Sequence, residues 1–314
     1  MRKKTANAVG IDIDSHGIRA VLINTREING KMVRTLTRWE EVRGNFDDET
    51  ELVQGLKSIR EKIGISHLSS VVTAVAGKQV YVAQIPFRKL PPDEMKNALR
   101  LEIRKNLPFE VNNATLEYQV MGKENDEEVS VLVTVVAGTL LTRHIKSLVS
   151  AGIRPAIVDV LPTAISNAFN AGTDILRPGQ AYVILHIGYG VCTLVVDGID
   201  VPFFHRNIFV PVDELYDRTN IDKEVLEQER KRRLEGLGEE VIRSLSFYQE
   251  SFTVATITGI YLLGEYLDKT EILDALSEKT GLTVSILDIC SKMNCTTKTV
   301  PGRFEIALAL ALRV

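Results

Sequence analysis

Two segments of the chain share one pattern of apolar and polar positions. The first is mainly apolar over residues 8–13, turns through polar residues up to Gly17, and is mainly apolar again over 18–23. The second is apolar over 181–185, turns at Gly188 and Gly190, and is apolar again over 191–196. An apolar strand, a tight turn and a second apolar strand are typical of a β-hairpin. We therefore predict two hairpins, one at the start of each half of the chain.

Helical patterns accompany both hairpins. Residues 49–64 and 267–280 are the clearest examples, and strands and helices alternate in both halves. Two similar mixed halves indicate an internal duplication and an α/β protein with a cleft between two lobes. We place the first lobe at 1–178 and the second lobe at 179–314.

A smaller α/β unit interrupts the first lobe at about 86–151. Pro91 and Pro92 come just before Asp93 and Glu94, which favours the start of a helix. Apolar residues then recur at helical spacing until Pro108. Strands are predicted at 114–121 and 129–137, and a helix at 140–151. We predict an inserted small subdomain here.

The second lobe has a predicted outer subdomain at about 212–256. It contains a charged helix over 222–236 and another helix over 239–252. Gly236 and Gly238 lie between them, and glycine weakens a helix interior, so we predict a break at this point. The run of Arg and Lys over 230–233 is typical of a solvated helix face.

Composition narrows the classes of function. The formal net charge of -3 gives no reason to expect a nucleic-acid partner. The three cysteines, Cys192, Cys290 and Cys295, fit a reducing compartment better than a disulfide framework. The chain has no apolar run of about 18 residues, which a transmembrane helix would need. We expect a cytoplasmic protein that meets a membrane through its partners.

These landmarks, in this order, resemble the PilM family of type IV pilus assembly proteins, within the actin-like (ribonuclease H-like) superfamily. The most specific part runs from Ile85-Pro86-Phe87 to Leu107-Pro108-Phe109 and on to Tyr118-Gln119-Val120. The resemblance implies an actin-like two-lobed fold and a place at the inner membrane. It also implies a partner, the cytoplasmic N-terminal tail of a PilN-like membrane protein, and contacts with other pilus or secretion assembly proteins. The cytoplasmic part of the secretion protein GspL is the alternative.

The resemblance also implies a nucleotide site whose cofactor, if the site is retained, is ATP with Mg²⁺. Matching positions are Asp12, Ser15, Gly17, Gly188, Gly190, Thr193 and Gly264. Four parts of the site depart from the family pattern, and at one of them residues 207–211 take the place of the Gly-Gly pair that usually follows the second hairpin. Asp14 stands where glycine is usual, His186 replaces an aspartate that orients the metal, and Glu265 and Tyr266 follow Gly264 where further glycines are expected. A carboxylate opposes phosphate, and Mg²⁺ prefers oxygen ligands to imidazole. We predict no catalytic residues, no metal ligands and a degenerate site.

If catalysis is lost, the protein is expected to act by binding, as a scaffold or adaptor. A slow ATPase or nucleotide-gated switch is the alternative, and a sugar kinase of the same superfamily is disfavoured because no catalytic aspartate stands in the expected context. For the partner surface we single out apolar and basic residues of the inserted subdomain: Phe87, Leu90, Lys96, Leu99, Arg100, Ile103, Arg104 and Phe109. Nothing in the residues decides whether the chain forms a homo-oligomer.

Overall fold

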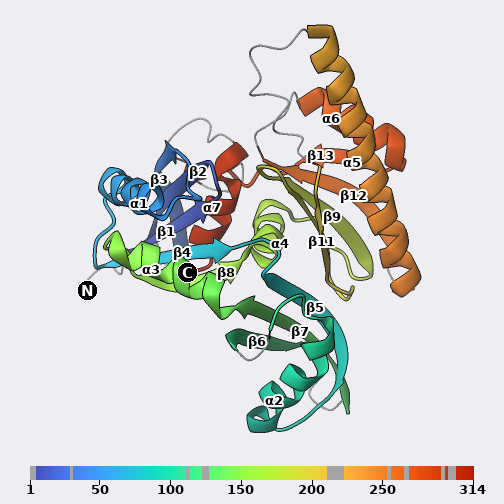
Figure 1. Ribbon diagram of the computed structural model, residues 1–314, viewed down its shortest axis with the longest axis horizontal. Coiled ribbons are helices and arrows are strands. Elements are labelled where there is room, and N and C mark those ends of the chain that lie inside the picture. The colour runs from blue at the N-terminus through green and yellow to red at the C-terminus, as the bar shows by residue number, and fades with distance from the viewer. Residues whose placement is uncertain are drawn as a thin grey trace.

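The structure is a computed structural model of the chain. It describes residues 5–28, 31–110, 113–121, 127–210, 223–252, 256–264, 269–290, 294–295 and 302–314. Two lobes stand side by side, and a smaller unit extends from the first (Figure 1).

The first lobe is built on a six-stranded sheet in the order β14-β3-β2-β1-β4-β8. Its strands are β1 (Thr5–Ile13), β2 (Gly17–Ile28), β3 (Lys31–Arg43), β4 (Ser69–Val75), β8 (Pro155–Val160) and β14 (Asn294–Cys295). The first three form an antiparallel meander, in which the predicted hairpin pairs Ile13 with Ile18 next to its turn. Strands β4 and β8 then continue the sheet in parallel with β1.

The second lobe repeats this plan with five strands in the order β11-β10-β9-β12-β13. They are β9 (Gln180–Ile187), β10 (Cys192–Asp197), β11 (Phe204–Ile208), β12 (Thr256–Leu263) and β13 (Val284–Ile286). Again three antiparallel strands are followed by two parallel ones. The shared strand order agrees with the predicted duplication.

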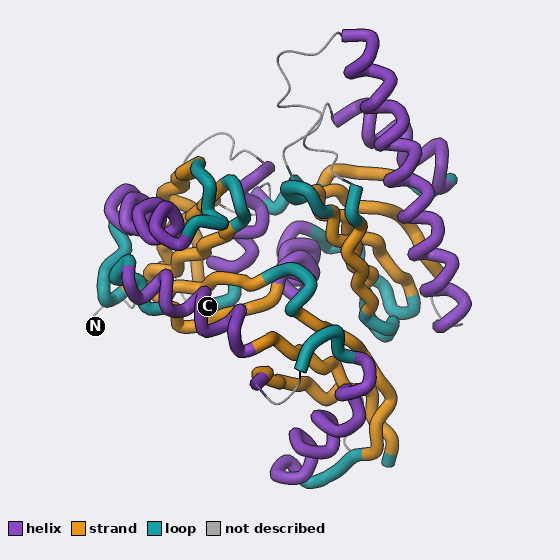
Figure 2. Tube along the Cα trace, viewed as in Figure 1, coloured by secondary structure: helices purple, strands orange, loops and turns teal. Residues whose placement is uncertain are grey.

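Helices cover both faces of the first sheet. Helices α1 (Glu49–Ile63) and α3 (Gly138–Ser150) pack on one face, where Ile11 and Ile18 meet Leu56 and Leu148. Helix α1 begins at Asp48, whose carboxylate accepts hydrogen bonds from the amides of Thr50 and Glu51. On the other face lie α4 (Leu161–Gly172) and α7 (Glu305–Ala311), which follows a short turn, η5 (Gly302–Phe304). The sheet is therefore enclosed between two helical layers (Figure 2).

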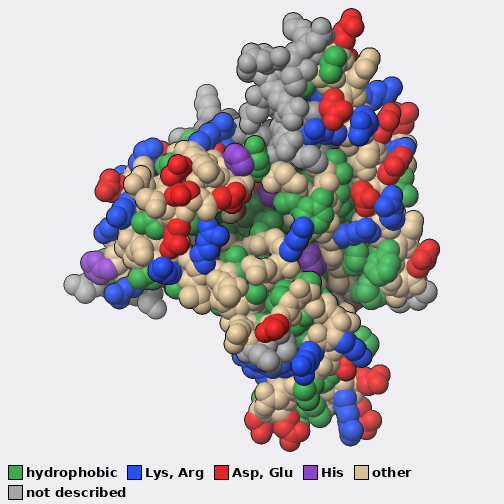
Figure 3. All heavy atoms as spheres, viewed as in Figure 1, with side chains coloured by type: hydrophobic (Ala, Val, Ile, Leu, Met, Phe, Trp, Pro, Cys, Tyr) green, Lys and Arg blue, Asp and Glu red, His purple; other side chains and the backbone are tan. Residues whose placement is uncertain are grey.

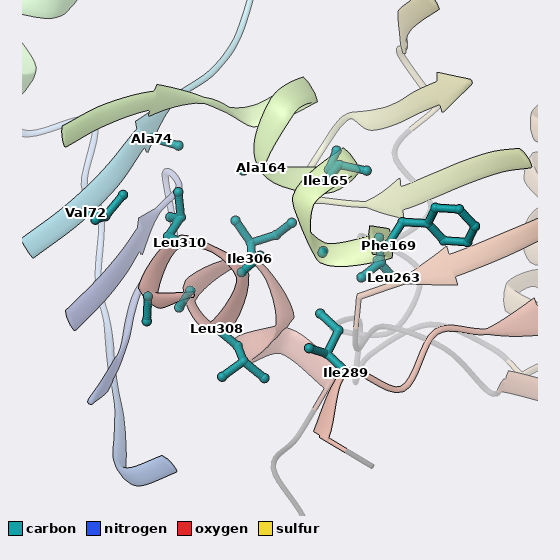
Figure 4. Close-up of a cluster of buried hydrophobic side chains, with 14 of the residues drawn as sticks. Val72, Ala74, Ala164, Ile165, Phe169, Leu263, Ile289, Ile306, Leu308 and Leu310 are labelled. Carbon is teal, nitrogen blue, oxygen red and sulfur yellow. The ribbon is translucent and has the colours of Figure 1, made fainter. Parts of the chain in front are cut away.

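One apolar core joins the two lobes. Side chains of β4, α4, β12 and α7 meet there, and Figure 4 shows Phe169 beside Leu263, with Leu310 of α7 near Val72 of β4. Gly10 of β1 is part of this packing, because a Cβ at that position would lie 1.8 Å from the carbonyl oxygen of Ala307. The glycine thus serves the close approach of α7 to β1.

The position of α7 corrects the predicted domain limits. Strand β14 pairs with β3, and α7 packs against the first sheet, so residues 294–295 and 302–314 return to the first lobe instead of belonging to the second. The residue limits of the inserted subdomain also differ from the prediction. Its sheet, in the order β5-β7-β6, uses β5 (Val80–Arg88), β6 (Ala114–Met121) and β7 (Glu128–Ala137). Helix α3, predicted inside the insertion, packs on α1 in the first lobe.

Among the described residues of the insertion, helices cover one face of its sheet. Helix α2 (Pro92–Ile103), extended by η1 (Arg104–Asn106), packs on Val131, Val133 and Val135 of β7. Alternate residues of a strand point to opposite faces, so Ser130, Leu132 and Thr134 lie on the face that α2 leaves open.

The predicted break in the second lobe's outer helix is wrong. Helix α5 runs without interruption over Lys223–Ser251, and α6 (Lys269–Thr280) packs against it. A Cβ at Gly238 would lie 2.9 Å from Cγ of Lys279, so this glycine allows the two helices to approach. The buried residues of α5 keep helical spacing through both glycines: Leu234, Leu237, Val241, Leu245 and Tyr248. Tertiary packing therefore outweighs the low helix propensity of glycine.

Candidate functional site

The turn of the first hairpin binds its own carboxylate. Asp14 Oδ1 accepts hydrogen bonds from the backbone amides of His16 and Gly17, both at 2.7 Å. Asp14 N donates to the carbonyl oxygen of Gly17 at 3.0 Å, which closes the turn. Successive loop amides of this kind form the concave anion site that a phosphate group uses in nucleotide-binding proteins. Here the side chain of Asp14 occupies those amides.

Arg19 holds the carboxylates of this site together. It lies opposite Asp12 across the hairpin, and its Nη1 is 3.2 Å from Asp12 Oδ2 and 2.7 Å from Asp14 Oδ2. Its Nε is 3.3 Å from Oε1 of Glu41 on β3. The other oxygen of Glu41 lies 3.2 Å from Nε of Arg303, just before α7. The result is an ion-pair cluster, with Arg19 only 5% exposed, at the position where a nucleotide would need free carboxylates.

Gly17 lies against the side chain of Arg19. Its φ is not positive, so the turn does not depend on a left-handed glycine. A Cβ at this position would lie 2.6 Å from Nη2 of Arg19. Gly17 is therefore small to make room for the guanidinium group.

Burial changes the proton affinity of two groups beside Arg19. It raises the pKa of Asp12 to about 6, against the lowering effect of the Arg19 charge. It lowers the pKa of His186 to about 4, and Arg19 adds to that lowering. The imidazole is therefore neutral at pH 7. Its buried Nδ1 forms no hydrogen bond with any residue that the structure describes.

The second hairpin brings a tyrosine to the first. Tyr189 lies in the turn between β9 and β10, and its ring stacks on His16 with 3.4 Å between centroids and 25° between planes. Ser15 Oγ is 2.8 Å from His16 Nδ1. Gly190 has a φ of 69°, a left-handed conformation that glycine adopts without steric cost, so the turn requires glycine at this position.

The space that remains between the hairpins is small. A cavity of about 90 Å³ is lined by Asp12, Asp14, Arg19, His186, Gly188, Tyr189, Gly264 and Arg303, among others. Ligand pockets commonly measure about 300–1,000 Å³. In the described part of the site, Asp14 occupies the loop amides that a phosphate would need, Asp12 is paired with Arg19, and the cavity is smaller than a nucleotide pocket. These residues do not fit ATP with Mg²⁺.

The structure brings together only some of the predicted nucleotide residues. Asp12, Gly188 and Gly264 line the same cavity. Thr193 is buried, and its hydroxyl donates to Asn207 Oδ1 at 3.1 Å. Gly264 has a φ of 112°, and a Cβ there would lie 2.5 Å from the carbonyl oxygen of Ile187. Glu265 and Tyr266, on which part of the prediction depended, lie outside the described residues.

Sequence reasoning did not identify Arg19, Glu41, Arg303, His16 or Tyr189 as members of this site. Arg19 carried a signal, since it is a lone charge within the apolar strand pattern and pairs with Asp12 in the predicted hairpin register. Arg303 and Tyr189 are distant in sequence, so only the fold brings them here.

A much larger cleft lies between the inserted subdomain and the two lobes. Its volume is about 990 Å³. One wall is the open face of the inserted sheet, with Thr115 and Gln119 of β6 and Thr134 of β7. The opposite wall is α4, which contributes Thr163, Ser166, Asn167 and Asn170, together with the turn after β10 and Arg313.

Part of the predicted partner surface lies on the other side of the inserted sheet. Leu99 and Ile103 are completely buried between α2 and the sheet, so they cannot contact a partner in this structure, which corrects the prediction for these two. Phe87, Leu90 and Phe109 pack partly against the same core. Lys96 Nζ lies 2.9 Å from Oε1 of Glu117, whereas Arg100 is half-buried and Arg104 is exposed. Figure 3 shows acidic and basic side chains interspersed on the lobes and the subdomain.

Among the described helices, none is long and apolar enough to cross a membrane.

Two lobes of duplicated topology, facing each other across paired hairpins, define the class of actin-like proteins. The solved structures agree. The PilM-PilN type IV pilus biogenesis complex matches with a TM-score of 0.82 and 21% identity over 98% of each chain. The ethanolamine utilization protein EutJ from Carboxydothermus hydrogenoformans matches with a TM-score of 0.51 and 14% sequence identity, over 98% of this chain and 89% of that one.

A protein of unknown function with an actin-like ATPase fold from Bacteroides thetaiotaomicron matches with a TM-score of 0.50 and 13% identity, over 98% of this chain and 95% of that one. At such identities these matches show the fold, and they confirm the predicted actin-like class. The family is shown by sequence. The model of the type IV pilus assembly protein PilM matches residues 10–209, and the chain belongs to this family.

Proposed function

We propose that this protein is an adaptor of type IV pilus or related secretion assembly, which holds the N-terminal tail of a PilN-like inner-membrane protein in the large cleft. It would act at the cytoplasmic face of the membrane, through its partners, and without ATP hydrolysis. Family membership and the fold shared with the PilM-PilN complex support this assembly role. The observation that carries the proposal for this chain is the cleft of about 990 Å³ beside the inserted sheet.

The inserted sheet offers an extended polypeptide two kinds of contact. Among the described strands, β6 pairs only with β7, so its other edge is available for backbone hydrogen bonds. Thr115, Gln119 and Met121 of β6 are exposed on the side that lines the cleft. Addition of a strand to such an edge gives affinity through backbone hydrogen bonds, and pockets on the wall give specificity.

The opposite wall has polar groups suited to a peptide backbone. Thr163, Ser166 or Asn167, and Asn170 recur along one side of α4. The buried Nδ2 of Asn167 has no hydrogen-bond partner among the described residues. A buried donor without a partner costs about 1–3 kcal/mol, so a ligand carbonyl that reaches it would bind favourably.

Charge indicates the chemistry of the tail. Five carboxylates line the cleft, those of Glu117, Glu128, Asp159, Asp197 and Asp200, whereas Arg313 is the one basic residue in the described lining. Arg313 is already paired, with its Nε 3.0 Å from Asp159 Oδ2. A segment with a Lys or Arg side chain would therefore complement this surface.

A nucleotide-gated switch is the second candidate, because Asp12, Gly188 and Gly264 still surround one cavity. The two candidates differ in a direct way. An adaptor binds the tail without nucleotide, whereas a switch binds MgATP at micromolar concentration and changes its affinity for the tail in response.

Calorimetry with a synthetic peptide tests the proposal. The peptide is the N-terminal tail of the PilN-like protein encoded by the same organism, titrated with and without MgATP. We expect binding that MgATP does not change. Gln119→Trp should fill the cleft and weaken peptide binding at least about tenfold, since a misplaced bulky group removes the shape complementarity of the wall.

Val120→Trp is the matched control. Val120 is the next residue on the same strand and is also exposed, but it points to the other face and does not line the cleft. The affinity of the Val120→Trp variant for the peptide should remain within about twofold of the wild-type affinity. Equal weakening by both substitutions, or peptide binding only in the presence of MgATP, would contradict the adaptor.

A further inference from the structure

We propose that the two hairpin turns form a latch which holds the lobes together without a nucleotide, because the chain supplies the charges that a nucleotide would otherwise bring. We define the latch as residues 14–17 and 188–191 with the side chains of Arg19 and Glu41. This inference concerns the cavity between the hairpins. It does not depend on the partner proposed for the large cleft.

The first part of the latch is an internal anion. The Asp14 carboxylate accepts from two consecutive backbone amides at 2.7 Å, which is the kind of contact that a phosphate oxygen makes with such a loop. The segment after β3 also forms hydrogen bonds with the backbone of this loop. The carbonyl oxygens of Ser15 and His16 accept hydrogen bonds from the amides of Phe46 and Gly44, at 2.8 Å and 3.2 Å. The amides are thus satisfied while no ligand is bound.

The second part is an internal cation. The Arg19 guanidinium is within 3.3 Å of three carboxylates, those of Asp12, Asp14 and Glu41. A magnesium ion in an actin-like site would neutralise acidic groups of this kind. Gly17 leaves space for this guanidinium, as its missing Cβ would lie 2.6 Å from Nη2. Arg43 and Arg303 also pair with Glu41, so three arginines of the chain face these three carboxylates.

The third part connects the lobes. His16 belongs to the hairpin of the first lobe and Tyr189 to that of the second, and their rings stack at 3.4 Å. A second contact between the lobes joins Gly264 at the end of β12 to Glu305 at the start of α7, where Gly264 N donates to Oε2 at 3.1 Å. Tyr189 and Gly264 both line the narrow cavity, so both contacts adjoin it.

Hydrogen exchange measured by mass spectrometry, on the full chain and without nucleotide, tests the latch. We expect slow exchange of the amides in 14–17 and 188–191, and no further slowing when MgATP is added at millimolar concentration. Tyr189→Ala should accelerate exchange in both turns by at least about tenfold, since it removes the ring that joins them. Tyr189→Phe retains the ring and should exchange like the wild type.

His16→Ala repeats the test from the other lobe, at an exposed position that does not contribute to the core. Exchange in β9 and α7, measured in the same samples, shows whether each variant is folded. Unchanged exchange in both turns after either substitution would overturn the latch. So would additional protection of residues 14–17 by MgATP in the wild type, because the ligand would then reach amides that we assign to Asp14.

Discussion

The narrow cavity between the hairpins and the wide cleft beside the inserted subdomain differ in how their polar groups are satisfied. In the cavity, Asp14 and Arg19 find partners within the chain, and about 90 Å³ remains. In the cleft, carboxylates outnumber basic groups, Asn167 has a buried amide nitrogen without a partner among the described residues, and about 990 Å³ is accessible.

This difference indicates where binding is still favourable. A ligand in the cavity would have to replace hydrogen bonds and ion pairs that the chain already makes, so its net gain would be small. In the cleft several carboxylates are also paired, as Asp159 is with Arg313 and Glu117 with Lys96. A ligand there could still satisfy the buried amide nitrogen of Asn167 and use a volume of about 990 Å³. In an actin-like fold the site between the lobes is the expected ligand site, but in this chain the cleft beside the insertion has the features of a binding site.

Removal of Arg19 should have the largest effect on the cavity. Arg19→Ala leaves the carboxylates of Asp12, Asp14 and Glu41 close together without their shared cation. We expect a loss of about 3–5 kcal/mol in the free energy of unfolding, measured in urea, because an uncompensated buried charge is costly. Arg26→Ala, an exposed position on the same strand, should change stability by less than about 0.5 kcal/mol. Similar losses in both variants would mean that the charge cluster contributes little.

The pH dependence of stability should distinguish two groups of the cavity. The pKa of His186 is lowered to about 4, so the unfolded chain binds more protons between pH 4 and 6.5, and this residue makes stability rise with pH in that window. Asp12 has the opposite sign. Its pKa is raised to about 6, so the folded chain binds more protons between pH 4 and 6, and its contribution falls as pH rises.

His186→Asn should therefore reduce the loss of stability between pH 6.5 and 4, by up to about 3 kcal/mol, as followed by urea unfolding at each pH. His67→Asn serves as a control because His67 is exposed. His144 and His205, whose pKa values burial also lowers to about 4, keep part of the slope in every variant. An identical slope in wild type and His186→Asn would show that this imidazole is not buried neutral.

The smallest expected effect concerns the charge of the cleft. Asp200→Asn removes one carboxylate at its rim, and Asn tolerates the positive φ of 59° at this position. We expect a basic tail peptide to bind about two- to fivefold more weakly, with a reduced dependence on salt concentration. Calorimetry at two ionic strengths measures both quantities. Unchanged affinity and an unchanged salt dependence would argue against a basic segment in the cleft.

Sequence reasoning identified the two hairpins, the inserted α/β unit and the actin-like class because these depend on local patterns. Apolar periodicity and turn residues are properties of consecutive positions, so the strands on both sides of each turn were placed correctly. The conflict of Asp14 with a phosphate loop was also visible, because it concerns one side chain in one turn. That Asp14 would itself occupy the loop amides was not visible.

The errors concern contacts between distant segments. The helix break at Gly236 and Gly238 was predicted from propensity, but the packing of α6 against α5 maintains one helix. The C-terminal segment was assigned to the nearer lobe, whereas α7 packs against β1 through Gly10. Leu99 and Ile103 were proposed as a surface, although the inserted sheet buries them.

The sequence by itself determined the duplicated α/β plan and the presence of a carboxylate, Asp14, in the turn of the first hairpin, because periodicity and turn chemistry are encoded in neighbouring residues. Only the tertiary structure decided which charged side chains pair with each other, and that the cleft beside the insertion is wide while the cavity between the hairpins is narrow. Arg19, Glu41 and Arg303 come from three separate segments, and His16 meets Tyr189 only when the lobes are together. Ion pairing and burial depend on distances in space of a few ångströms, and sequence separation does not specify such distances.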